Sequence, residues 1–360
     1  MRRAVLLLAL LLALAVPAWG TELGDAFDLD AVAAAAPAEA EEVLGDADPG
    51  SADLEGGLER LWTSLQARFP AALREIARPL AAILAVTLTC SMAESFAPGG
   101  PAGEAVQMAG CLAVAAIGAE DVKSVLALGT GTLERLGEFS RVLLPTLTAA
   151  AAAGGAPGSA AAVWAASALF SDLLLTAANG LVLPLLTGFV AVSCACAVLG
   201  DRRLAGPVQL LQWGTRTLLK GLALAFTAYL GLSRILGAAS DAAAVKTARA
   251  LLSSGVPVIG RVLSDASEAL VAGAGLLRTS IGLYGLVAVL AALLLPLLRL
   301  ALRVGLFRAA AAVCTAVAGE RVGRLLDRFG SAYALLLGLV STAAAIELLA
   351  IISLIRTVTP

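Results

Sequence analysis

The sequence contains no histidine. Without an imidazole, the chain cannot build a Ser-His or Cys-His nucleophile, nor the usual histidine-bearing metal site. The five cysteines all lie in apolar runs: Cys90, Cys111, Cys194, Cys196 and Cys314. No two of them have the Cys-x-x-Cys spacing of a redox or zinc motif, and their odd number gives no hint of a disulfide framework. We therefore expect buried thiols, no metal site, no cofactor, and a protein that is not an enzyme.

Charged residues are scarce. They make up 14% of the chain, whereas 59% of the residues are hydrophobic, and a soluble domain carries about 25% charged residues. The charged residues are too few to cover the surface of soluble domains. We therefore expect the excess apolar surface to face lipid. The net charge of -2 argues against nucleic acid as a partner, because phosphate binding needs a basic face. The composition predicts an all-α, polytopic transmembrane protein.

The N-terminus has the layout of a secretory signal. Arg2 and Arg3 precede an uninterrupted apolar run from Ala4 to Val16, which Pro17 ends. We predict a signal peptide over residues 1–20; the alternative is an uncleaved first anchor helix.

A segment of different composition follows the predicted signal peptide. From Glu22 to Glu59 the chain has twelve acidic residues and no Lys or Arg, so it cannot bury enough apolar area to offset its ordering entropy. We expect residues 21–70 to be an exported, largely disordered segment that ends in a short amphipathic helix on the outer membrane surface.

The multi-span membrane domain is predicted over residues 71–360, with seven or eight spans. The clearest are 76–96, 105–128, 181–199, 208–236, 281–298 and 333–355. Prolines and glycines break the stretch 142–178 into two pieces, which favours either two short spans or a re-entrant hairpin. The 15 residues 304–318 are short for a span and are expected as an interfacial or re-entrant helix.

Arginines indicate the orientation. Arg202 and Arg203 follow one predicted span, and Arg299 to Arg328 contains six arginines against two acidic residues. Both regions should face the cytoplasm, which places the mature N-terminus, the loop 238–280 and the C-terminus outside.

Glu347 is the clearest ionisable residue within a predicted span, because long uncharged runs flank it on both sides. A carboxylate at that depth is expensive and marks either an interhelical contact or an ion path. It is one candidate functional residue.

The loop 238–280 supplies the other candidates. Two amphipathic helices are expected on either side of Pro257, which fixes φ and lacks an N–H, and Gly260 should help to form a rigid corner. Asp265 and Glu268 lie on the polar face of the second helix. This pair is either a docking surface for partner proteins or an ordinary packed loop. The spacing Gly255-x4-Gly260 lacks the Lys and Ser/Thr of a phosphate loop, so no nucleotide is expected.

Several motifs occur in a recognisable order. Gln212-Trp213 comes first, then Asp241 with Lys246-Thr247-Ala248, then the run Val256–Arg261, then Leu263–Ala266, then Gly282 before a span that carries Pro296. With these motifs in this order, the chain resembles members of the stage III sporulation protein AE family.

The resemblance implies a place in the mother-cell membrane that surrounds the forespore, with other stage III sporulation A proteins as partners. Together these would form a channel-like or secretion-like complex needed for spore development. The alternative is a self-sufficient small-solute permease, for which internal repeats would be expected and none is apparent.

Overall fold

The computed structural model describes residues 29–44, 54–96, 100–200, 205–253 and 259–356. Over 232–253 and 259–272 it describes the backbone alone. The predicted signal peptide and most of the acidic segment lie outside the described residues. Within those residues the secondary structure is helical and contains no strand. The all-α prediction is confirmed for this part of the chain.

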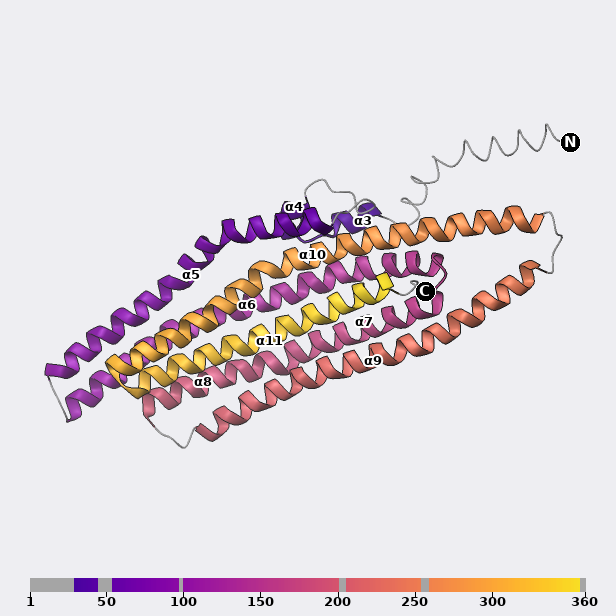
Figure 1. Ribbon diagram of the computed structural model, residues 1–360. Helices are drawn as coiled ribbons and strands as arrows, with labels where there is room; N and C mark the ends of the chain where they lie inside the picture. Colours follow the sequence, from indigo (N-terminus) through magenta and orange to yellow (C-terminus); the bar gives the residue numbers. More distant parts are fainter. Residues whose placement is uncertain (1–28, 45–53, 97–99, 201–204, 254–258, 357–360) are drawn as a thin grey trace.

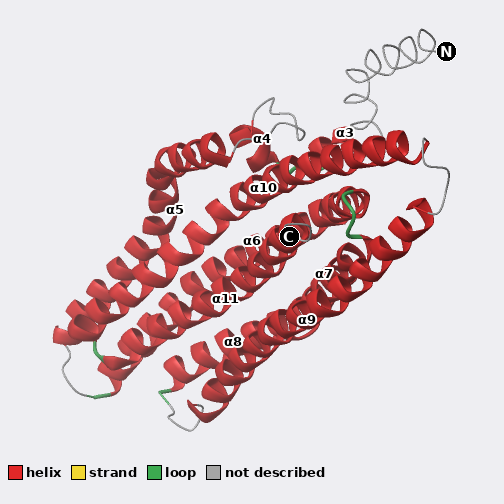
Figure 2. Cartoon of the chain, turned by 45° about the vertical axis from the view of Figure 1, so that its right-hand side comes forward, coloured by secondary structure: helices red, strands yellow, loops and turns green. Residues whose placement is uncertain are grey.

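Long helices run up and down the length of one bundle (Figure 1). The elements in chain order are α3 (Leu29–Ala34), α4 (Ala38–Leu44), α5 (Leu54–Phe96), α6 (Pro101–Ala153), α7 (Pro157–Ala177), the π turn η2 (Ala178–Val182), α8 (Leu183–Leu199), α9 (Ala205–Ser253), α10 (Ile259–Ala318) and α11 (Glu320–Arg356). Because α7, η2 and α8 follow one another without a break, they form one rod, so the described residues contain six long rods. Figure 2 shows the same antiparallel arrangement after a 45° turn.

Proline and glycine set the ends of these helices. Pro101 and Pro157 open α6 and α7, where the missing N–H is no loss. Gly155 has φ +97° in the turn between α6 and α7, and Gly200 closes α8 in the left-handed conformation, with φ +69°. Side chains other than glycine resist that conformation. The helix boundaries therefore follow directly from residue type.

The broken stretch 142–178 does not form two separate short helices. Its first piece is the end of α6, which continues through Pro145, and its second piece is α7, which continues into α8. The π turn η2 lies directly before Pro184, whose missing N–H leaves a carbonyl of the preceding turn without its usual donor; such turns accommodate local breaks in hydrogen bonding. The predicted span 181–199 is thus the second half of a longer rod.

Within the part of the chain that the structure describes, four helices are long and apolar enough to cross a membrane: Glu55–Phe96, Pro157–Leu199, Gly273–Val317 and Glu320–Arg356. The predicted segments 281–298 and 304–318 are both parts of α10, which runs through Pro296. The separate interfacial or re-entrant helix expected at 304–318 was therefore wrong. The sequence suggested a break because charged residues interrupt the apolar run, and those charges are compensated inside the bundle.

The centre of the bundle is formed by α10 and α11. In their most apolar stretches 61% and 56% of the residues are buried, against 22% in α5 and 33% in the α7–α8 rod. Phe307 of α10 packs edge-on against Tyr333 of α11, with ring centroids 4.9 Å apart, and against Phe329 at 6.4 Å. Helices α5 and α7–α9 thus surround the central pair and present more of their apolar surface outward.

Close helix crossings depend on glycine at particular places. A Cβ on Gly118 of α6 would lie 2.2 Å from a ring carbon of Phe329 on α11, and one on Gly285 of α10 would lie 2.4 Å from a methyl of Leu143 on α6. In a lipid environment, where hydrophobicity does not drive helices together, such close approach is a main source of packing energy.

We predict opposite outcomes for two alanine substitutions in α6. Gly118→Ala should destabilise the fold by roughly 1–3 kcal/mol through overpacking against Phe329. Gly131→Ala is the matched control, because a Cβ there meets nothing within 4 Å, and the higher helix propensity of alanine should leave stability equal or higher. Thermal unfolding of the detergent-solubilised variants measures both. Equal melting temperatures for the two variants would contradict the crossing described here.

Candidate functional site

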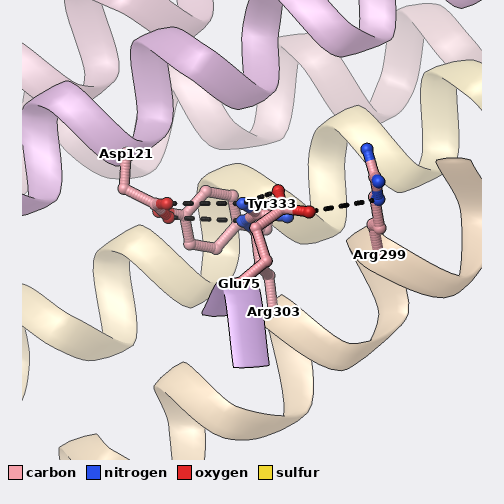
Figure 3. Close-up of polar contacts among 5 residues, drawn as sticks. All are labelled: Glu75, Asp121, Arg299, Arg303 and Tyr333. Atoms are coloured by element: carbon pink, nitrogen blue, oxygen red, sulfur yellow. Dashed lines mark hydrogen bonds and ion pairs between the residues drawn. The ribbon is translucent and has the colours of Figure 1, made fainter. Parts of the chain in front are cut away.

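A buried polar network joins four helices at the middle of the bundle (Figure 3). We call it the Arg303 cluster; its members are Glu75 of α5, Asp121 of α6, Arg299 and Arg303 of α10, and Tyr333 of α11. The Arg303 guanidinium lies 3.4 Å from each Asp121 carboxylate oxygen and 3.1 Å from Glu75 Oε1. The Tyr333 hydroxyl donates to Asp121 Oδ2 at 2.5 Å.

The cluster runs from the interior of the bundle to its surface. Arg303 is 3% exposed and Asp121 8%, whereas Glu75 is 42% exposed and holds Arg299 at 3.4 Å on the outer side. Two arginines and two carboxylates balance in charge. Removal of a buried charge from water is expensive, and only good geometry and further hydrogen bonds repay it. The hydroxyl of Tyr333 supplies one such bond to Asp121, whereas Nη1 of Arg303 is buried without a hydrogen-bond partner among the described residues.

Sequence reasoning missed this cluster. Arg299 and Arg303 were assigned to a cytoplasmic basic region, and Asp121 was not singled out although it interrupts the predicted span 105–128. The structure corrects this: Arg303 is buried within α10 and faces carboxylates from two other helices. Two features of the sequence could have indicated it. Asp121 lies inside one apolar segment, and Arg299 and Arg303 lie four residues apart beside another. Such charges in apolar segments are typical of residues that pair within a helical bundle.

Glu347 lies in a second buried site, farther along α11. The hydroxyls of Ser140 on α6 and Ser171 on α7 donate to its two carboxylate oxygens at 2.6 and 2.8 Å, and the residue is 4% exposed. The carboxylate therefore connects three helices in the bundle interior. Fourteen residues separate it from Tyr333, roughly 21 Å along the helix axis.

The other predicted site residues lie away from these clusters. Pro257 is outside the described residues, while Gly260, Asp265 and Glu268 belong to the first turns of α10. Farther along α10, the buried Arg278 reaches the turn between α6 and α7, since its Nη1 atom is 3.9 Å from the Cβ position of Gly154. The structure thus separates these candidates from Glu347 and places them beyond that turn.

The ends of α9 and α10 extend past the α6–α7 turn in both views of the molecule (Figures 1 and 2). We call residues 238–253 of α9 and 259–277 of α10 the α9–α10 arm. From Ile259 to Arg278 the helix rises roughly 28 Å. The sequence predicted a loop with two amphipathic helices over 238–280. In its described residues this stretch instead consists of the end of α9 and the start of α10, which are both long helices.

At both sites the polar side chains contact one another across neighbouring helices. Among the described residues, no three His, Cys, Asp or Glu side chains are grouped to hold a metal ion. The Arg303 cluster pairs its charges internally, and the Glu347 carboxylate is held by two hydroxyls. Both sites fix neighbouring helices relative to one another.

We predict strong coupling between Arg303 and Asp121 in a double-mutant cycle. Arg303→Met should cost roughly 3–5 kcal/mol, because it leaves a buried carboxylate without its partner. Asp121→Asn should also destabilise, and the double variant should lose much less than the sum of the two. The measurement is unfolding of the purified variants in detergent. Simple additivity would show that the pair does not interact.

The family model of stage III sporulation protein AE matches residues 48–357. The stage III sporulation protein AE of Bacillus subtilis (strain 168) is 23% identical over 208 residues, which cover 55% of this chain and 50% of that protein. The match thus spans about half the length of this relative, and no solved structure matches the chain. Because the family model covers most of its length, the chain belongs to the stage III sporulation protein AE family.

Proposed function

We propose that this chain is a non-enzymatic, membrane-embedded subunit of a stage III sporulation assembly. The assembly would be channel-like or secretion-like and would lie in the mother-cell membrane around the forespore, with other stage III sporulation A proteins as partners. Family membership supports the sporulation role, and four long apolar helices support the membrane location. A sequence without histidine favours structural over catalytic work.

The up-and-down order of the six rods leads us to propose six crossings, with the start of α5 and the end of α11 on the same side. Among the described residues, α5, the α7–α8 rod, α10 and α11 are long and apolar enough to cross, and α6 and α9 would cross beside them. At one end of the bundle Gly200 lies against Arg321, near the start of α11; Arg324 and Arg328 follow on α11, and Arg202 and Arg203 follow Gly200 in sequence. The positive-inside rule places this arginine-rich end in the cytoplasm. The arm, the C-terminus and a mature N-terminus released from a signal peptide would then lie outside.

The α9–α10 arm is the observation that carries the proposal. As a 60-residue helix, α10 is roughly 90 Å long, about three times the ~30 Å thickness of a hydrocarbon core. The part beyond the α6–α7 turn therefore has no need of lipid. It carries both signs of charge, including Arg261, Asp265 and Glu268, and so suits contact with another protein.

Glu347 is the observation that favours a self-sufficient permease. A buried carboxylate between three helices resembles the midplane polar groups of transporters. Such a protein would work without partners. Changes on the arm would then leave sporulation unaffected, whereas Glu347→Gln would abolish it.

We predict that charge reversal on the arm weakens the assembly without unfolding the protein. Asp265→Arg and Glu268→Arg should each lower the recovery of partner proteins at least severalfold. The introduced arginine would repel the partner groups that the native carboxylate attracts. Membrane levels should stay normal, because both residues lie on the predicted polar face of the helix, where such changes alter stability by about 0.5 kcal/mol or less. The measurement is co-purification from sporulating cells.

The matched control is Glu104→Arg, a reversal at an exposed position in the first turn of α6, at the opposite end of the bundle. It should retain the partners. Gly260→Val should instead reduce the amount of folded protein, because it adds a branched side chain at the start of α10, beside the corner expected at Pro257. Full recovery of partners with both arm reversals would refute the arm as the docking surface.

A further inference from the structure

A polar cavity lies at the arginine-rich end of the bundle, between α5, α6 and the junction of α10 with α11. Its volume is about 250 Å³, and its polar lining includes Thr87, Ser91, Glu94, Gln107, Arg321 and Arg324. Cys90 and Cys111 also lie in its wall. Neither the Arg303 cluster nor the Glu347 site contributes to it.

Two arginines (Arg321 and Arg324) and two glutamates (Glu94 and Glu320) line the cavity, so their charges sum to zero, but among the described residues Arg321 forms no ion pair with either carboxylate. Glu94 accepts a hydrogen bond from Gln107 at 2.5 Å, and Glu320 pairs with Arg324 at 2.5 Å. Arg321, half-buried between these pairs and the end of α8, has no ion-pair partner within the described residues. Hydroxyls of Thr87 and Ser91 face the same space, although each already donates to a backbone carbonyl.

Exposed apolar side chains lie on the two helices that form one wall of the cavity. Leu88, Met92 and Phe96 of α5 are 52%, 65% and 86% exposed, and Met108 and Leu112 of α6 are 44% and 60% exposed. This apolar surface starts beside the polar lining and follows the α5–α6 pair toward the middle of the bundle. A ligand with a charged head and long apolar tails would satisfy both surfaces.

We propose that this cavity binds the phosphate group of an anionic phospholipid, with Arg321 as its principal contact. Arginines between helices on the cytoplasmic side can hold anionic lipid head groups, and a guanidinium forms strong charge-assisted hydrogen bonds to phosphate oxygens. The acyl chains would cover Leu88, Met92 and Leu112. The inference rests on the membrane location proposed above, but not on any partner protein.

Alkylation of Cys90 tests the proposal in the full-length protein. The purified protein in a neutral detergent is treated with iodoacetamide, and peptide mass spectrometry follows each cysteine separately. Phosphatidylglycerol at ten times its dissociation constant should slow the reaction of Cys90 about tenfold, whereas phosphatidylcholine should not. Cys194, partly exposed on α8 outside the cavity, is the internal control and should react at an unchanged rate.

Three variants assign the effect to the cavity. Arg321→Gln should abolish the protection, Glu94→Gln should strengthen it by removing a negative charge from the wall, and Arg135→Gln, a change of the same charge on a half-exposed residue far along α6, should preserve it. Equal protection by the two lipids, or retention of the effect in Arg321→Gln, would overturn the proposal. Equal protection by inorganic phosphate alone would assign the site to free phosphate and overturn the lipid assignment.

Discussion

The ion pair between Arg303 and Asp121 is the interaction on which the rest of the arrangement depends. In a lipid environment apolar helices gain little from one another by hydrophobicity, so packing and polar contacts must set their register. Arg303 contacts α5 through Glu75 and α6 through Asp121, and Asp121 in turn holds α11 through Tyr333. A shift of any of these helices by one turn would leave a buried charge uncompensated. This cost fixes how α5 and α6 lie against the central pair.

The remaining features follow from that fixed core. Phe307 and Phe329 pack around Tyr333, and farther along α11 the Glu347 carboxylate holds α6 and α7. The cavity at the arginine-rich end lies between α5, α6 and the start of α11. At the opposite end, α9 and α10 continue past the α6–α7 turn, so one arm projects from the helical bundle.

The sequence predicted the helical class, a few helix ends such as those near 96 and 199, and the place of Glu347 within an apolar helix, because these depend on local signals. The long uncharged runs around Glu347 are such a signal. The lengths of the rods were not predictable. Pro145 looks like a helix break in sequence, yet it lies inside α6, and Pro296 lies inside α10, which extends well beyond the predicted span 281–298 at both ends.

The pairing within the Arg303 cluster could not be worked out from sequence for a related reason. Glu75, Asp121 and Arg303 are far apart in the chain, and a charge inside or beside an apolar segment does not indicate which residue it meets. Only the packing of α5 and α6 against α10 brings them together. The relation of Ser140 and Ser171 to Glu347 likewise depends on tertiary structure, since serine within a helix gives no signal of its own.

The orientation of the bundle is the most direct test of the account. Exposed positions at the two ends, Ser95 of α5 and Ala153 of α6, can each be replaced by cysteine and expressed in intact, non-sporulating cells. The measurement is labelling of each new cysteine by a membrane-impermeant maleimide, followed by peptide mass spectrometry. The account predicts labelling of Ala153→Cys in intact cells and of Ser95→Cys only after permeabilisation. The reverse pattern, or ready labelling of both in intact cells, would contradict it.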